Sequence, residues 1–172
     1  MAPDGILSAQ GISAAAYMAR ESNIVSWLFL QLESEANDQN VELQERCMEL
    51  VAFLSQTIEI FEVQPNWSTL PRVSSEKKSV EPLTKKRKES PEINGIDLLL
   101  QAIARFRKKQ PTSDQQIEFL ENACIALSSS IAFSNVNLQH FIDLEGIPLV
   151  VYCEKNNVYS GSSALRLLDF SR

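Results

Sequence analysis

The sequence predicts an all-α fold built as a helical solenoid, and three observations support this. The chain of 172 residues has 44% hydrophobic residues with mixed charges, as a globular protein does. The pattern Gly-Ile followed by apolar residues occurs at Gly95 and again at Gly146, 51 residues later, with a looser copy at Ile24. The apolar residues of the first copy are spaced to fall on one stripe of a helix. They are Ile96, Leu99, Leu100, Ile103 and Phe106. A helical unit that returns at a fixed period is typical of stacked repeats.

We divide the chain into four parts. Residues 1–11 are a frayed N-terminus, 12–62 are helical repeats, 63–92 are a disordered basic insertion, and 93–172 are helical repeats that end inside a repeat. The gap of 72 residues between Ile24 and Ile96 is too long for one repeat. An insertion of roughly 20 to 25 residues accounts for the excess.

The first helical block begins with an Ala-rich helix over 12–20. Ser22 or Asn23 then caps a helix that runs to about Leu32 and is apolar on most sides, so we expect it to lie between neighbours. A longer amphipathic helix spans 41–61, with an acidic outer face. Its apolar stripe is Leu43, Cys47, Leu50, Val51, Leu54, Ile58 and Phe61.

The segment 63–92 lacks periodicity and contains four prolines among many Ser, Lys and Glu residues. Such a composition buries too little apolar surface to offset the entropy of ordering, so we interpret it as disordered. Trp67 and Leu70 are not required to pack on the body. Residues 72–90 hold seven basic and three acidic residues, so the rest of the chain has ten more acidic than basic residues. A basic segment therefore hangs on an acidic body.

The second helical block opens with a helix over 93–109. It ends in four cations where the helix dipole favours positive charge, which explains them structurally; a partner-binding patch is the alternative. These cations are Arg105, Arg107, Lys108 and Lys109. Thr112 or Ser113 caps the next helix, which reaches Phe133. A short helix over 138–144, the Gly146 copy and a last fragment over 163–170 complete the chain.

Several classes of function lack support. No apolar run reaches the length of a membrane span, so we expect no membrane partner. Cys47, Cys124 and Cys153 have no ligand spacing and fit reduced core thiols in an intracellular protein. The motifs of hydrolases, P-loop proteins and zinc peptidases do not occur, and we assign the single histidine, His140, a structural role. We therefore expect no catalytic residues, metal or cofactor.

A short helix, a Gly-Ile helix and a longer third helix form the layout of armadillo repeats. More closely, Asn94–Gln101, Glu121-Asn122, Leu144–Ile147 and Ser162–Asp169 resemble the catenin-beta-like protein 1 family. The resemblance covers roughly 23–62 and 93–170 and matches an internal portion of a family member. It implies a truncated, right-handed armadillo-like solenoid. It also implies a nuclear scaffold associated with the Nineteen complex of the spliceosome, binding basic segments of partner proteins.

The predicted third helices, 41–61 and 113–133, are the candidate groove for such a partner. Glu118 and Glu121 could attract a basic peptide, although ordinary solvated helix faces explain them equally well. Importin-type grooves carry a Trp and an Asn four positions apart on this helix, and Ile125 and Ser129 stand nearest to those positions. This chain therefore departs from the importin pattern.

The run Lys85, Lys86, Arg87 and Lys88 is a candidate nuclear-import signal that an import receptor would bind. A solvated charge run is one alternative. Another is a nucleic-acid-contacting module that acts through 72–90, which loss of RNA binding on deletion of that segment would test. Ser90, next to Pro91, is a candidate phosphorylation site whose phosphate would offset the cations.

Overall fold

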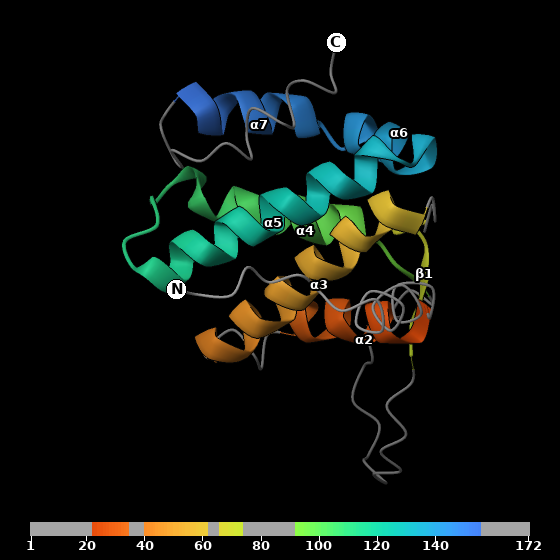
Figure 1. Cartoon of the computed structure of the whole chain (residues 1–172). Helices are drawn as coiled ribbons and strands as arrows, with labels where there is room; N and C mark the ends of the chain where they lie inside the picture. Colours follow the sequence, from red (N-terminus) through yellow and green to blue (C-terminus); the bar gives the residue numbers. More distant parts are fainter. Residues whose placement is uncertain (1–21, 35–39, 62–65, 74–91, 156–172) are drawn as a thin grey trace, which may run out of the picture.

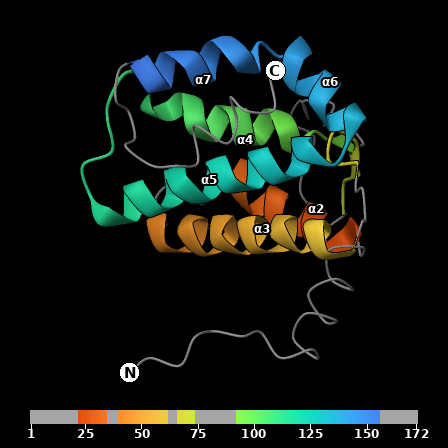
Figure 2. The same cartoon turned by 45° about the horizontal axis from the view of Figure 1, so that its top comes forward.

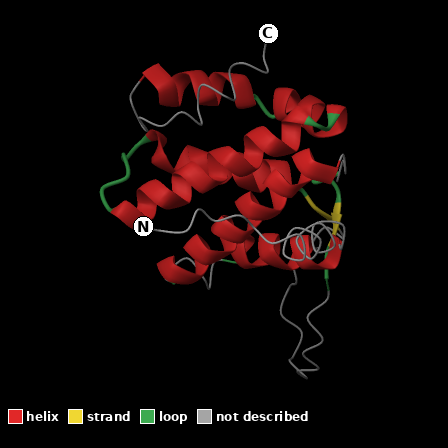
Figure 3. Cartoon of the chain, in the orientation of Figure 1, coloured by secondary structure: helices red, strands yellow, loops and turns green. Residues whose placement is uncertain are grey.

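The computed structural model describes residues 22–34, 40–61, 66–73 and 92–155 (Figure 1). Helices dominate this part of the chain, as predicted, and the two strands are only two residues long (Figure 3). The elements in order are α2 (Ser22–Glu33), α3 (Val41–Phe61), β1 (Leu70–Pro71), β2 (Glu92–Ile93), α4 (Gly95–Ala104), η2 (Arg105–Arg107), α5 (Asp114–Ala132), α6 (Asn135–Asp143) and α7 (Gly146–Lys155).

The helices stack in successive pairs, as a solenoid requires. In Figure 2, α2 and α3 lie at one end, α4 and α5 lie in the middle, and α6 and α7 lie at the other end. The longer helices α3 and α5 lie side by side in front of α2 and α4, and they pack on each other more extensively than any other described pair. One contiguous core runs through the layers. The predicted all-α solenoid is thus confirmed.

Most helix limits agree with the predicted ones, and side-chain caps explain two of them. The Ser113 hydroxyl accepts from Gln116 N–H at the start of α5, as predicted. Ser134 caps α6 in the same way, so this helix begins at Asn135 and not at 138. The helix predicted over 93–109 is shorter, because α4 ends at Ala104 and continues as the tighter turn η2. The helices predicted over 12–20 and 163–170, and the N-terminal 1–11, lie outside the described residues.

The first repeat copy is displaced by one residue from its predicted position. In α4 the buried residues are Ile96, Leu99, Leu100 and Ile103 among others. The same spacing of buried residues in α2 starts at Val25, whereas Ile24 is exposed. One residue turns a helix by about 100°, so the two alignments place different faces on the core. The sequence predicted that α2 lies between neighbours, but Trp27 is 49% exposed, so one side of the helix faces solvent.

The segment 66–73 is ordered, so the prediction of disorder over the whole of 63–92 is wrong at this point. Trp67 is 1% exposed, and its ring packs edge-on against Phe29 of α2 with centroids 5.5 Å apart. Its backbone carbonyl oxygen accepts from Gly95 N–H at 2.7 Å, and its backbone N–H donates to Asn137 Oδ1 at 3.1 Å. Three layers therefore meet at one residue, and this burial offsets the entropy of ordering the segment.

Pairing of strands β1 and β2 closes the same region. Leu70, which is buried, lies opposite Ile93, so the chain leaves and re-enters the body at neighbouring points. Residues 74–91 lie outside the described residues. The insertion therefore starts and ends at a fixed stem beside α2 (Figure 1).

Both repeat glycines are needed because an aromatic ring lies against them. A Cβ on Gly95 would lie 2.8 Å from Phe29 Cε2. A Cβ on Gly146 would overlap the ring of Phe141 and lie 2.8 Å from the Phe141 carbonyl oxygen. The preceding residue Glu145 has φ 57°, a left-handed conformation that costs a side-chain-bearing residue about 1 kcal/mol or more.

Asn137→Ala tests the contact made by Trp67. The change leaves Trp67 N–H and the Ser130 carbonyl, which now accepts from Asn137 Nδ2 at 3.0 Å, without their partner. We expect a loss of about 2 kcal/mol or more in the free energy of unfolding, measured in urea. The exposed Asn135→Ala is the matched control and should change stability by about 0.5 kcal/mol or less. Equal effects of the two changes would contradict the role of Asn137.

Gly146→Ala should lower the free energy of unfolding by about 1–3 kcal/mol, because the added methyl group has no room beside Phe141. Glu145→Gly in the same turn is the control, since glycine relieves the left-handed strain while adding chain entropy. It should stay within about 1 kcal/mol of the parent. If Gly146→Ala unfolds at the urea concentration of the parent, the close approach is not a constraint.

Candidate partner-binding groove

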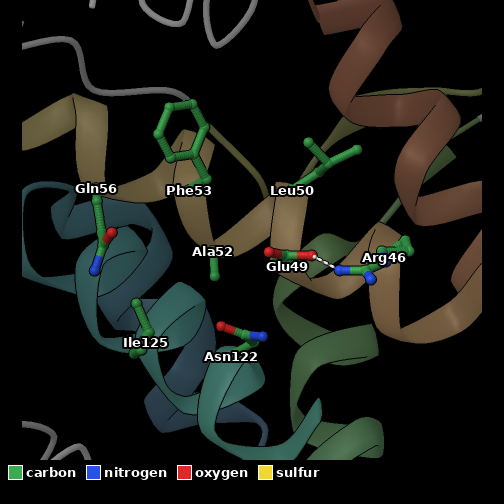
Figure 4. A pocket seen from close by; sticks show the side chains of 8 residues that line it. All are labelled: Arg46, Glu49, Leu50, Ala52, Phe53, Gln56, Asn122 and Ile125. Carbon is green, nitrogen blue, oxygen red and sulfur yellow. Dashed lines mark hydrogen bonds and ion pairs between the residues drawn. The ribbon is translucent and has the colours of Figure 1, made fainter. Parts of the chain in front are cut away.

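The surface between α3 and α5, here the α3–α5 groove, is the candidate site. The helices run parallel (Figure 2): Glu45 lies beside Glu118 near their first turns, and residues 46–56 of α3 and 122–125 of α5 line one hollow further along both. A hollow of about 450 Å³ opens between them (Figure 4). Its size lies within the range of about 300–1,000 Å³ typical of ligand pockets. It is lined by Arg46, Glu49, Leu50, Ala52, Phe53, Gln56, Asn122 and Ile125.

Polar groups of both helices point into this hollow. Glu49 forms an ion pair of 2.8 Å with Arg46, and their side chains are 54% and 65% exposed. Figure 4 shows the Asn122 amide directed at the same space from α5. An exposed ion pair contributes about 0–1 kcal/mol, so another cation can replace Arg46 on Glu49 at little cost. The hollow therefore offers a carboxylate and an amide to a ligand.

The apolar part of the hollow is unusually accessible for a core helix. Leu50 was predicted on the buried stripe of 41–61, but it is 48% exposed at this site. Cys47, Val51 and Leu54 are buried as predicted. Leu50 and the half-buried Phe53 and Ile125 give the hollow surfaces against which an aliphatic chain can pack.

Two carboxyl groups meet across the groove just before the hollow. The hydrogen bond to Glu118 raises the pKa of Glu45, and loss of hydration and the charge of Glu118 raise it further. Glu45 is buried and Glu118 is exposed. Negative charge on both groups at this distance is unfavourable, and a cation placed between them would relieve that repulsion.

The structure separates the predicted groove residues. Ile125 lines the hollow, Glu118 interacts with Glu45 outside the lining, and Glu121 is exposed on α5, also outside it. Ser129 was predicted in the groove, but it is 5% exposed and belongs to the buried side of α5. Asn122, which was not among the predicted groove residues, lies one turn before Ile125 and lines the hollow.

The other predicted sites lie either outside the described residues or in the core. Lys85, Lys86, Arg87, Lys88 and Ser90 lie outside the described residues. Cys47, Cys124 and Cys153 are buried, as predicted for core thiols. Burial raises the pKa of the Cys47 and Cys153 thiols, which makes them poor nucleophiles at neutral pH.

The described residues contain neither a membrane-spanning helix nor a cluster of metal ligands. No helix in 22–34, 40–61 or 92–155 is long and apolar enough to span a bilayer. No group of three His, Cys, Asp or Glu side chains in the described part could hold a metal ion.

Comparison with known proteins identifies relatives. A model of the family described as catenin-beta-like, Arm-motif containing nuclear matches residues 6–172. This match includes 63–92, which the individual motifs had left outside the resemblance. The chain is 36% identical over 78 residues to beta-catenin-like protein 1 of Rattus norvegicus, and 35% identical to that of Homo sapiens. It is 33% identical to the homolog of Schizosaccharomyces pombe.

The matched segment covers 45% of this chain and 14% of each of these relatives, so it corresponds to a small part of their length. No solved structure matches the chain.

Glu45→Gln tests the carboxyl pair through the pH dependence of stability. Because the pKa of Glu45 is raised above 4.5 in the fold, the folded chain binds more protons than the unfolded chain above about pH 4.5. Its contribution to stability is therefore present at low pH and is lost as pH rises through the raised pKa. Glutamine cannot ionise and can still donate to Glu118.

The variant should melt at a higher temperature than the parent at pH 7, and this advantage should disappear below about pH 4.5. Glu121→Gln, an exposed carboxyl on the same helix as Glu118, is the control and should follow the parent at both pH values. A Glu45→Gln variant that melts with the parent at pH 7 would show that the two carboxyls do not interact.

Proposed function

Because the chain belongs to the catenin-beta-like, Arm-motif containing nuclear family, we propose that it is a nuclear scaffold that binds Lys/Arg-rich segments of partner proteins in the α3–α5 groove. The chain is an armadillo-type scaffold of a family not known for catalysis. The observation that carries the proposal is the hollow between α3 and α5, which combines acidic, amide and apolar groups. The proposed setting is pre-mRNA splicing, in association with the Nineteen complex of the spliceosome.

Electrostatics supports a basic partner. The chain outside 72–90 has ten more acidic than basic residues. At the groove itself, Glu45, Glu49 and Glu118 follow each other along the contact between α3 and α5. An acidic surface raises the rate at which a cationic segment arrives and disfavours anionic ones. A cation between Glu45 and Glu118 also relieves their mutual repulsion.

The lining supports an extended segment with long side chains. The aliphatic stem of a Lys or Arg would lie on Phe53 and Ile125 while its charged end meets Glu49. An amide has both donors and an acceptor, so Asn122 can bond the backbone of the bound segment. This would fix the segment in place without requiring a particular sequence. The groove would then select for positive charge and length of side chain.

The basic run Lys85–Lys88 fits a different step, which is entry into the nucleus. We propose that an import receptor binds this run and that phosphorylation of Ser90 weakens binding by offsetting its charge. The run lies between the two ordered strands that form the stem of the insertion.

Three substitutions in the hollow test the proposed function. Glu49→Gln and Asn122→Ala should each weaken binding of a Lys/Arg-rich peptide by about two- to fivefold, because each removes one exposed contact. Arg46→Ala should strengthen binding by up to about fivefold, because it frees Glu49. Fluorescence anisotropy with the whole chain at several salt concentrations measures these changes.

Asp143→Asn is the control, since it removes one negative charge from α6 and its amide oxygen can still accept from Gln139. It should leave affinity nearly unchanged. Binding that does not weaken with added salt, or equal effects of Glu49→Gln and Asp143→Asn, would reject the groove as the site.

A further inference from the structure

A second hollow lies at the opposite end of the same two helices, where α3 and α5 begin. It has a volume of about 270 Å³ and is lined by α3, η2, the loop after it and α5. This volume is below the usual range for small-molecule pockets and suits one or two side chains. Its lining residues are Val41, Gln44, Arg105, Phe106, Lys109, Gln110, Gln115, Gln116 and Phe119.

The hollow is positively charged although the body is acidic. Four of the seven Lys and Arg residues in the described ranges fall within 105–109. Arg105 and Lys109 line the hollow, and Arg105 Nη1 donates to the buried Gln44 Oε1 at 3.1 Å. Arg107 faces α7, with its guanidinium 4.9 Å from the centre of the Tyr152 ring. Gln44 thus holds one cation in place at the edge of the hollow before any ligand arrives.

The floor of the hollow is aromatic. The rings of Phe106 and Phe119 are 6.5 Å apart and inclined at 54°. Val41 at the rim is exposed, and three glutamine amides of the lining come from the loop and the first turns of α5. An apolar side chain seated here would meet the two rings, with Arg105 and Lys109 in the same lining. The two hollows of α3 and α5 therefore differ in charge.

We propose that this second hollow binds a short acidic segment of a partner protein. One large apolar side chain of the segment would lie on Phe106 and Phe119, and flanking carboxylates would pair with Arg105 and Lys109. The scaffold would then hold two partner segments of opposite charge along one pair of helices. This site is independent of the basic-segment site proposed above.

A protein segment fits the hollow better than RNA. Acidic side chains flank it on α3 and α5, namely Glu42, Glu45, Asp114 and Glu118. A long phosphate backbone would pass these carboxylates and be repelled, whereas a segment with two or three carboxylates places its charge only at the cations. The amides in the lining also suit a peptide backbone.

The test is fluorescence anisotropy of a short fluorescein-labelled Asp/Glu-rich peptide with one central Phe, titrated with the whole chain at about 0.05 and 0.15 M salt. Lys109→Glu should weaken binding by about three- to tenfold, because it removes one attraction and adds one repulsion. Lys155→Glu, an equal charge change at an exposed residue of α7, is the control and should change affinity by about twofold or less. Replacing the central Phe of the peptide by Ala should weaken binding by about tenfold.

Other results would overturn the proposal. The proposal fails if the peptide does not bind, or if Lys109→Glu and Lys155→Glu have equal effects. It also fails if the Phe→Ala peptide binds as well as the original. A single-stranded RNA that binds more tightly than the peptide, with loss of binding in Lys109→Glu, would assign the hollow to nucleic acid instead. Circular dichroism of each variant confirms that the helices are intact.

Discussion

The arrangement of the layers depends on Trp67, a residue outside every helix. Its ring packs on Phe29 of α2. Its backbone carbonyl accepts from Gly95, the first residue of α4, and its backbone N–H donates to the side chain of Asn137 in α6. Contacts within a solenoid normally join only neighbouring repeats. Here one residue joins three layers and fixes the point at which the basic insertion leaves the body. The position of α4 relative to α2 then sets the position of α5 relative to α3.

That packing determines which side chains of α3 and α5 meet. Because the helices run parallel, each turn of α3 meets the corresponding turn of α5, and the character of the surface changes along the pair. A cationic hollow with an aromatic floor comes first, the Glu45–Glu118 pair follows, and the hollow around Glu49 and Asn122 comes last. A surface of this kind suits a scaffold, whose work is to hold partner segments in a set order.

The sequence predicted where the helices begin and end better than it predicted which of their faces are buried. Periodicity located α3 and α5 almost to the residue, and the cap at Ser113 explained the start of α5. It could not show that Leu50 is exposed, because a residue on an apolar stripe is buried only where a neighbour covers it. Nor could it align α2, since Ile24 and Val25 are both apolar and only burial distinguishes them. Trp67 was missed because its partners, Phe29 and Asn137, are 38 and 70 positions away. Asn122 was part of a recognised motif, but its direction into the groove required coordinates.

The proposed function depends most on a basic segment lying between α3 and α5. Nuclear magnetic resonance of the isotope-labelled chain with a spin-labelled Lys/Arg-rich peptide tests this directly, since the label broadens signals of nearby amides. We expect the strongest broadening in 46–56 and 122–125, with little effect on α6 and α7. Broadening that is strongest on α6 and α7, or absent while the peptide is bound, would contradict the account.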